Sequence, residues 1–326
     1  MPTIHVRTSS VVVTLAICAT AFVQGCDARA PTAAVAVVTN VASAKASAWE
    51  FGPWGTPVNL GAPVNTTFGE NRPFISAEGD QLFFTSGQTL GSQGANDLWV
   101  ARRSDDSQAW GAPINLGPVV NSGGDDLAAF LTADGKQLYF ARAGACGAVD
   151  LWVARRHNKH QDTGWDSADD LGCSVNSTGN DADPFLVEDG EEEGTLYFVS
   201  NRNPLTGFDV YKSVYDKQAG TFGPAQAVAE LNSAGAEFKV VIRGDGLEAF
   251  IGSNRPGSAG NDIWVSTRAR QTDPWGAPKN LTGINSTGAD APGSLSADGT
   301  TLYFQSNRAG GLGLGDIWMV KRARIR

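Results

Sequence analysis

Residues 296–318 read SADGTTLYFQSNRAGGLGLGDIW, and this stretch decides the fold because its parts recur along the chain. Asp298-Gly299 is a tight-turn signal of the kind that joins two antiparallel strands. Leu302-Tyr303-Phe304 is the apolar triplet of a buried strand, and Asp316-Ile317-Trp318 opens the next strand after a glycine-rich loop. The stretch therefore predicts three consecutive antiparallel strands.

Four features recur at intervals of 53 to 59 residues, and they recur in phase. Triplets of Asp, an aliphatic and an aromatic residue begin at Asp97, Asp150, Asp209, Asp262 and Asp316. Single asparagines stand at Asn65, Asn121, Asn176, Asn232 and Asn285. Aromatic residues of a further series are Trp54, Trp110, Trp165, Phe222 and Trp275. Apolar triplets begin at Leu82, Leu138, Leu196, Ala249 and Leu302.

Each repeat contains four short strand-like segments, and the fourth has the form Trp-Gly-x-Pro-x-Asn-Leu, as in residues 110–116. Its proline suits an outer edge strand, where a missing N–H group is tolerated. Four antiparallel strands repeated radially form a propeller blade. We therefore predict an all-β, five-bladed β-propeller of four-stranded blades over residues 49–326. The first segment is a fourth strand, Trp54 to Leu60, so we expect this N-terminal strand to close the ring by completing the fifth blade.

The combined motif resembles the TolB-type WD40-like propeller repeat. The resemblance rests on Ser296 to Gly299, the apolar triplet, Ser306-Asn307-Arg308 and Asp316-Ile317-Trp318, and it covers roughly residues 54–326. It implies a propeller fold but no single function, because such repeats occur in TolB, in peptidase propellers and in exported lipoproteins. TolB carries a separate α/β domain before its propeller, where this chain has a tether, so the resemblance does not carry over the role of TolB.

The first 25 residues are predicted to be a lipoprotein-type signal peptide. An apolar run from Val11 to Val23 leads into Gly25-Cys26, which resembles a lipobox and makes Cys26 the predicted lipidation site. Ordinary secretory cleavage nearby is the alternative. Residues 26–48 are mostly small and predict a flexible tether. We expect a protein exported in a bacterium and anchored in a membrane, facing the periplasm or the outer surface.

The formal net charge of −9, from 34 acidic and 25 basic residues, argues against non-specific binding to nucleic acid or to an anionic lipid surface. Membrane contact is therefore expected through the lipid anchor alone. The expected partner is an envelope protein, a peptide or a glycan, and the expected oligomeric state is a monomer.

Charged residues recur on one face of the predicted ring, where the loops from strand two to three and from strand four to one lie; we call it the mouth face. The residues that open strand one are Glu70, Asp126, Asp181, Glu237 and Asp290. Three arginines follow strand two, at Arg202, Arg255 and Arg308, and their counterparts in the first two blades are Gln88 and Gly144. The aspartates that open strand three are predicted to be structural; they are Asp97, Asp150, Asp209, Asp262 and Asp316.

Three interpretations of the strand-one acids and the arginines remain open. They can be structural, because a residue present in every blade serves what each blade needs. They can line a ligand site at the channel mouth, made lopsided by the missing arginines. They can also provide the two carboxylates of a glycoside hydrolase, although nothing singles out a pair. A bound cation such as calcium would suit clustered carboxylates, but no further feature supports one, and no cofactor or metal site is predicted.

Cysteines, histidines and aromatic residues add one expectation each. Cys146 and Cys173 remain after export and are predicted to form a disulfide within blade two, closing a loop of about 27 residues worth roughly 3 kcal/mol. His157 and His160 lie in a polar stretch that predicts a solvated loop. The strand-three aromatic residues predict core packing between blades, whereas Trp49 lies outside that series and is the freer candidate for a sugar platform.

Our main functional expectation is a non-enzymatic, envelope-associated propeller that binds a protein, peptide or glycan at one face of the ring, with no catalytic residue assigned. The alternative is an exported glycoside hydrolase or related carbohydrate-active enzyme that uses carboxylates at the channel mouth.

Overall fold

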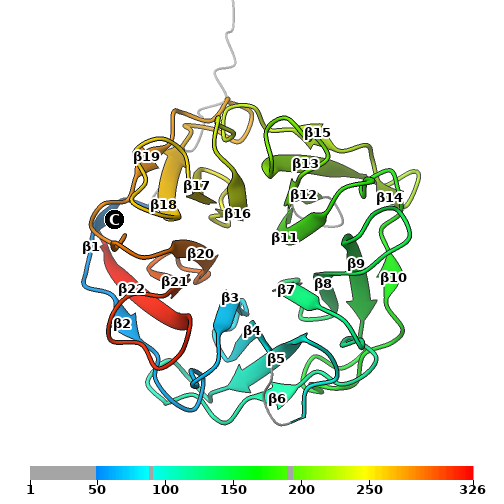
Figure 1. Cartoon of the computed structure of the whole chain (residues 1–326), viewed down its shortest axis with the longest axis horizontal. Coiled ribbons are helices and arrows are strands. Elements are labelled where there is room, and N and C mark those ends of the chain that lie inside the picture. The colour runs from blue at the N-terminus through cyan, green and yellow to red at the C-terminus, as the bar shows by residue number, and fades with distance from the viewer. Residues whose placement is uncertain (1–48, 88–90, 189–193, 326) are drawn as a thin grey trace, which may run out of the picture. The chain divides into compact units, whose positions relative to one another are not determined.

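The structure is a computed structural model that describes residues 49–87, 91–188 and 194–325. Within those ranges the chain is all-β and forms five antiparallel sheets arranged as the blades of a closed ring (Figure 1). The five-bladed propeller is thereby confirmed. The predicted signal peptide, Cys26 and most of the tether lie outside the described residues. In the described ranges there is also no helix with the length and apolar character needed to cross a membrane.

The strands of each blade follow one another from the centre of the ring outward. Blade one contains β3 (Glu70–Ile75), β4 (Gln81–Gly87), β5 (Asn96–Arg102) and β6 (Ile114–Asn115). Blade two contains β7 (Asp126–Leu131), β8 (Gln137–Arg142), β9 (Asp150–Arg155) and β10 (Asp169–Asp170). Blade three contains β11 (Asp181–Glu188), β12 (Gly194–Ser200), β13 (Asp209–Asp216), β14 (Thr221–Phe222) and β15 (Gln226–Ala227). Blade four contains β16 (Glu237–Ile242), β17 (Glu248–Ser253), β18 (Asp262–Thr267) and β19 (Lys279–Asn280). Blade five contains β20 (Asp290–Leu295), β21 (Thr301–Ser306), β22 (Asp316–Arg324), β1 (Phe51–Trp54) and β2 (Val58–Asn59).

The outermost strands are shorter than the repeat predicts. The motif at residues 110–116 yields a ladder of two residues, Ile114–Asn115, and β2, β10, β15 and β19 are equally short. In blades one, four and five a proline stands directly before the pair and has no N–H group to donate, which limits the ladder; these prolines are Pro113, Pro278 and Pro57. The outer edge of each blade is thus largely a loop that pairs with strand three over two residues.

The ring is closed by the start of the chain, as predicted. Both β1 and β2 pair antiparallel with β22, which is the last strand. The Asn65 side chain adds a second clasp, because its Oδ1 accepts from Ile317 N and its Nδ2 donates to Ile317 O, both at 2.9 Å. Asn121, Asn176, Asn232 and Asn285 make the same pair of bonds to strand three of their own blades. The asparagine amide thus stands in for a short stretch of strand backbone.

A buried ion pair fastens the closing strand to blade four. The Arg322 guanidinium makes two bonds to the Glu248 carboxylate, at 2.9 and 2.6 Å, and lies 3.8 Å from the centre of the Phe51 ring. A two-bond arginine–carboxylate contact fixes geometry as well as charge. Because Phe51 belongs to β1 and Arg322 to β22, this contact joins both ends of the described chain to one neighbouring blade.

The end of strand three carries a repeated arginine that the sequence analysis missed. In four blades this arginine donates through Nε to the carbonyl of the turn glycine and stacks on the aromatic residue near the start of strand four. These arginines are Arg103, Arg156, Arg268 and Arg322. A cation over an aromatic ring is favourable and here orders the outer edge, where the ladder is short.

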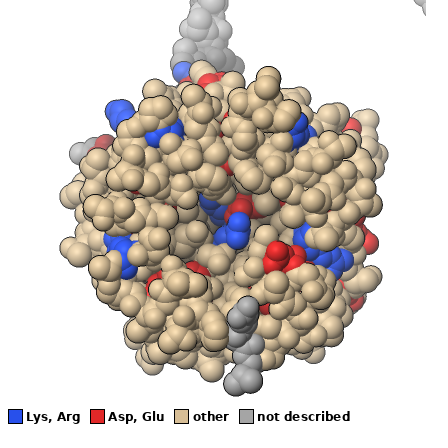
Figure 2. Space-filling view, in the orientation of Figure 1, with Lys and Arg blue, Asp and Glu red and all other residues tan. Residues whose placement is uncertain are grey.

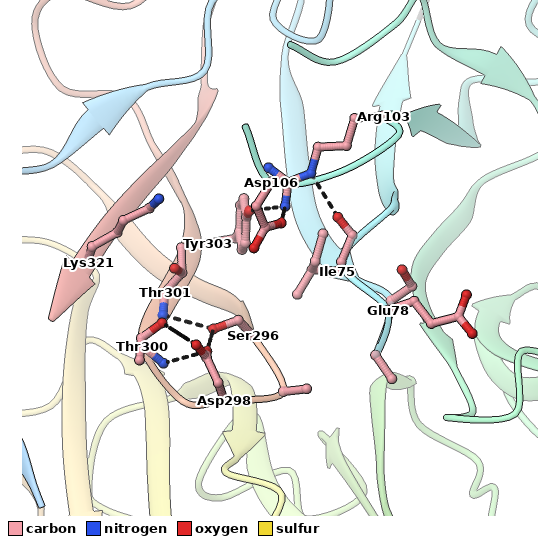
Figure 3. A pocket seen from close by; sticks show the side chains of 14 residues that line it. Ile75, Glu78, Arg103, Asp106, Ser296, Asp298, Thr300, Thr301, Tyr303 and Lys321 are labelled. Atoms are coloured by element: carbon pink, nitrogen blue, oxygen red, sulfur yellow. Dashed lines mark hydrogen bonds and ion pairs between the residues drawn. The ribbon is translucent and has the colours of Figure 1, made fainter. Parts of the chain in front are cut away.

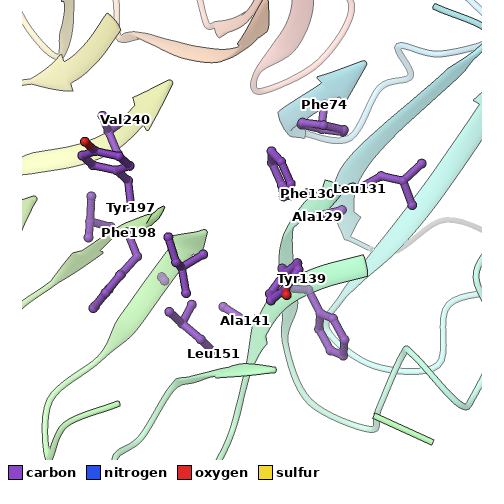
Figure 4. Packing of buried hydrophobic residues seen from close by; sticks show 14 of the residues in the cluster. Phe74, Ala129, Phe130, Leu131, Tyr139, Ala141, Leu151, Tyr197, Phe198 and Val240 are labelled. Atoms are coloured by element: carbon purple, nitrogen blue, oxygen red, sulfur yellow. The ribbon is translucent and has the colours of Figure 1, made fainter. Parts of the chain in front are cut away.

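The core lies between neighbouring sheets. The second strands supply its most deeply buried aromatic residues, including Phe83, Phe140, Phe198, Phe250 and Phe304. Phe130 of β7 packs against Phe74, with ring centres 4.8 Å apart (Figure 4). It also packs against Phe185, at 5.0 Å. No blade buries both of its faces alone, so each depends on its two neighbours.

Replacing Asn65 by alanine tests the clasp at the closure. Asn65→Ala leaves the N–H and C=O groups of Ile317 buried without these partners, so we expect the free energy of unfolding to fall by about 2–4 kcal/mol. Urea denaturation followed by tryptophan fluorescence measures it. Asn158→Ala, in an exposed loop, is the control and should change stability little. An Asn65→Ala protein as stable as the parent would contradict the role of the clasp.

Candidate functional site

The five acids that open strand one are completely buried. Glu70, Asp126, Asp181, Glu237 and Asp290 each show 0% relative exposure. Each carboxylate accepts bonds from the backbone N–H and the hydroxyl of the Ser or Thr four residues earlier, as Asp290 does from Ser286. These acids hold the loop that enters each blade and are closed off from solvent. Their geometry favours the structural interpretation over the ligand-facing one.

The three predicted arginines neutralise three of those acids. Arg202, Arg255 and Arg308 bind Asp181, Glu237 and Asp290 at 2.6, 3.0 and 2.6 Å. Each arginine also donates to a backbone carbonyl of the preceding loop and lies over the strand-three aromatic ring of its own blade. The arginines are thus internal struts of blades three, four and five.

In blade two a different arginine lies over the strand-three aromatic ring. Gly144 occupies the predicted arginine position, but Arg142, two residues earlier, lies 4.0 Å from the centre of the Trp152 ring. It replaces the missing cation over the aromatic ring, but the buried Oδ1 of Asp126 accepts no hydrogen bond from any residue that the structure describes. Burial raises the pKa of Asp126 to about 6, against the hydrogen bonds from Ser122 that lower it. The counterpart in blade one, Gln88, lies outside the described residues.

The aspartates that open strand three are structural, as predicted. Their carboxylates accept from loop N–H groups or hydroxyls just before the strand, as Asp150 does from the N–H groups of Cys146 and Gly147. This role covers Asp97, Asp150, Asp209, Asp262 and Asp316.

The predicted disulfide between Cys146 and Cys173 is present, with the two Cα atoms 5.5 Å apart. It lies beside Asp150 and Asp170, and these three groups are near enough to suggest a metal site. The sulfur is bonded to Cys173, however, and is not a thiolate that could bind a metal. The two histidines do lie in an exposed loop, and Trp49 is covered by Arg324, whose Cζ lies 4.4 Å from the centre of its ring.

A different set of residues lies at the centre of the ring. The innermost strand of every blade has a β-bulge or irregular register near its third residue. The third residues are Arg72, Ala128, Asp183, Lys239 and Pro292. Arg72, Ala128 and Asp183 have positive φ angles of 52°, 59° and 55°, which are unusual for residues other than glycine. Such strain costs about 1–3 kcal/mol per residue and concentrates at functional sites.

Three of these residues form an ion cluster, which we call the central triad. Arg72 Nε lies 3.1 Å from Asp183 Oδ2, and Lys239 Nζ lies 3.2 Å from Asp183 Oδ1. Arg72 belongs to blade one and Asp183 to blade three, so this contact passes across the ring in front of blade two. Figure 2 shows basic and acidic side chains gathered at the hollowed centre of the ring.

The surroundings of the central triad fix its charge states. Burial by itself raises the pKa of Asp183, but the charges of Arg72 and Lys239 outweigh it, and the pKa is lowered overall. Burial lowers the pKa of Lys239, and the nearby Asp183 carboxylate offsets part of this effect. The Arg72 backbone N–H donates to Gln305 Oε1 at 2.7 Å, which holds the strained residue in place. Asp183 is therefore an ionised carboxylate clamped by two cations.

Arg72, Asp183 and Lys239 are not among the predicted site residues. The residue at their position differs from blade to blade, so it belongs to no recurring series. A signal was available, because charged residues vary at the third position of strand one while the first position is always acidic. Departure from the repeat is thus the mark of this site.

A pocket lies between blades one and five, at the strand one–two turns and so on the face opposite the mouth face (Figure 3). It has a volume of about 230 Å³ and is lined by the two strand one–two turns, Arg103, Asp106 and Tyr303. Its polar groups largely satisfy one another: Arg103 pairs with Asp106, and Asp298 accepts from Ser296 and Thr300. The pocket has neither the strain nor the ion cluster found at the ring centre.

No protein-family model matches the sequence, and no curated protein matches it. Solved structures do match the fold. A GH43_1 enzyme from Xanthomonas citri complexed with xylotriose is 13% identical, with a TM-score of 0.57 over 82% of this chain and 89% of that one. An endo-arabinase from Bacteroides thetaiotaomicron is 14% identical, with a TM-score of 0.55 over 84% and 99%. The Bacillus subtilis arabinanase Arb43A is 16% identical, with a TM-score of 0.54 over 80% and 96%. This chain thus has the five-bladed propeller fold of these glycoside hydrolases.

The unpaired Asp126 predicts an unusual dependence of stability on pH. Its folded pKa of about 6 lies above the ordinary value of 3.8. The folded protein is therefore favoured by the protonated Asp126 below about pH 4, and this contribution to the free energy of unfolding is lost as the pH rises through 6. Asp126→Asn removes the buried charge and should raise the free energy of unfolding at pH 7.5 by on the order of 1–3 kcal/mol, with no gain near pH 4.

Asp181→Asn is the matched control for this prediction. The same substitution in blade three breaks the buried pair with Arg202, so it should destabilise the protein at pH 7.5. Denaturant unfolding at several pH values measures both variants. A loss of stability in Asp126→Asn at pH 7.5 would rule out the raised pKa as a source of instability.

Proposed function

We propose that the protein is a carbohydrate-active propeller that holds a glycan at the centre of the ring, over the central triad. The observation that carries this proposal is the cluster of Arg72, Asp183 and Lys239, in which Arg72 and Asp183 have positive φ angles. These three charges do not recur at the same position of the other blades, so the structural repeat does not account for them. Strain and charge placed together at the axis are typical of a binding or catalytic site.

The comparisons favour the enzymatic alternative over a non-enzymatic binder. The three solved structures described above are glycoside hydrolases, and the Xanthomonas citri enzyme has xylotriose bound. Hydrolysis of a glycosidic bond uses two carboxyl groups, one to donate a proton and one as a base or nucleophile. Among the five third-position residues, Asp183 is the one carboxylate, and its pKa is lowered, so it is ionised. At 2% exposure it would act by holding Arg72 and Lys239 in place rather than by touching the sugar. Glycan binding is therefore supported by the residues of the triad, and hydrolysis by the fold.

A glycan screen with one substitution tests this proposal. The purified propeller is assayed for release of reducing sugar from arabinan, xylan and pectic glycans, and for binding by thermal shift. We expect Asp183→Asn to weaken glycan binding and to lower any turnover by about 10-fold or more, because Arg72 and Lys239 lose the carboxylate that positions them. Asp125→Asn, an exposed aspartate, should leave the turnover unchanged.

The outcomes of the screen separate the two functions. Turnover that depends on Asp183 in a folded variant establishes a hydrolase. Binding without turnover establishes a non-enzymatic glycan-binding propeller. If no glycan either binds or is cleaved, carbohydrate recognition is wrong, and a pull-down from the native envelope with the propeller as bait becomes the next experiment.

We also propose that the chain is a TolB-type repeat protein, exported and anchored by a lipid at Cys26, and that it acts as a monomer in the cell envelope. The recurring motif supports the repeat type, and the apolar run that leads to Gly25-Cys26 supports the anchor. A single lipidated cysteine followed by 22 residues of tether, residues 27–48, would leave the ring free to meet a glycan away from the membrane.

Substitution of the lipidation site tests the anchor. Cys26→Ala should move the protein from the membrane fraction to the soluble fraction, because no other segment is expected to hold it there. Fractionation followed by immunoblotting measures the distribution, and Cys18→Ala is the matched control. A Cys26→Ala protein that stays in the membrane fraction would count against lipidation at this residue.

A further inference from the structure

We infer that the central triad selects a sugar that carries a carboxylate group, so that the glycan bound at the ring centre is acidic. This inference rests on the proposed carbohydrate binding and adds the chemical class of the ligand. It concerns the charges that the ring centre presents to a ligand.

The triad has one positive charge in excess. Arg72 and Lys239 carry two positive charges, and Asp183 alone offsets them within the cluster. Asp183 shows 2% relative exposure and the Lys239 side chain 5%, whereas the Arg72 side chain is 32% exposed. The buried carboxylate is therefore shielded behind the cations, and the accessible part of the cluster is the arginine. A second anion that binds at this point would balance the charge.

Arg72 presents its outer edge in a fixed orientation. Its Nε faces Asp183 at 3.1 Å, and its Nη1 donates to Asn71 Oδ1 at 3.1 Å. No bond from Nη2 to another described residue is present, so Nη2 and the second Nη1 hydrogen remain available as parallel donors. That pair matches the spacing of the two oxygens of a carboxylate. The positive φ angle of Arg72 and the bond from its N–H group to Gln305 hold the residue before a ligand arrives.

Neutral donors lie next to the same arginine. Asn71 and Gln305 each use the side-chain oxygen as an acceptor, from Arg72 Nη1 and Arg72 N. Their amide nitrogens have no hydrogen-bond partner in the described ranges, and amide nitrogens of this kind bind sugar hydroxyl oxygens. An arginine fork flanked by two amides would recognise a uronic acid through its carboxylate and its ring hydroxyl groups together.

Isothermal titration calorimetry with matched sugars tests the inference. The probes are trigalacturonate, its methyl ester, which lacks the charge, and neutral xylotriose. We expect trigalacturonate to bind about 10- to 100-fold more tightly than the ester, and the preference to shrink as salt is raised. Arg72→Gln should remove the preference. Arg72→Lys should keep part of it, because the charge remains while the fork is lost.

An arginine away from the ring centre provides the control. Arg270→Gln, at an exposed loop position, should leave all affinities unchanged, and thermal unfolding shows whether each Arg72 variant is folded. If Arg72→Gln fails to fold, the comparison of acid with ester on the parent protein and the result for Arg72→Lys still decide. Equal affinity for the acid, the ester and xylotriose would overturn the inference and leave the proposed function standing.

Two further results would also overturn the inference. If none of the sugars binds, both the inference and the proposed carbohydrate binding fail. If an acetylated tripeptide with a free C-terminal carboxylate binds as tightly as trigalacturonate and also needs Arg72, the site recognises carboxylates without recognising sugar.

Discussion

The pairing of β22 with the start of the chain is the contact on which the rest of the propeller depends. A four-stranded blade exposes an apolar face on each side, so every blade is stable only between two neighbours. Blade five is built from both ends of the described chain, and without β1 and β2 its outer edge would remain unpaired. The Asn65 clasp and the Arg322–Glu248 pair act at this same boundary.

Within the closed ring, the residues that recur in every blade and those that differ between blades have different roles. The repeated acids, asparagines and arginines satisfy loop backbone groups and cover aromatic rings inside each blade. The third residue of the innermost strand does not belong to this repeated set and differs from blade to blade, as Arg72, Asp183 and Lys239 show. Charge at the axis can then be chosen for a ligand, while the surrounding blades compensate for the strain of positive φ angles.

The fold could be predicted from the sequence in nearly full detail, because in-phase repeats such as the Asn65 and Asp97 series encode both strand order and closure. The site could not. Arg72 and Asp183 meet across the ring, 111 positions apart, on backbone conformations that no local motif signals. Arg142 escaped notice for a related reason, since it takes over the stacking role from a position two residues away from the expected one. The depth of burial of the strand-one acids was also beyond the sequence, which shows their recurrence but not whether water reaches them.

The mixed origin of blade five bears on how the protein is made. Its strands come from residues 51–59 and 290–324, so the last blade cannot be assembled until almost the whole chain has been synthesised. Up to that moment the growing polypeptide is an open arc of blades with two unprotected sides. The same arrangement makes the interval before closure the time at which the chain is most exposed to aggregation and proteolysis.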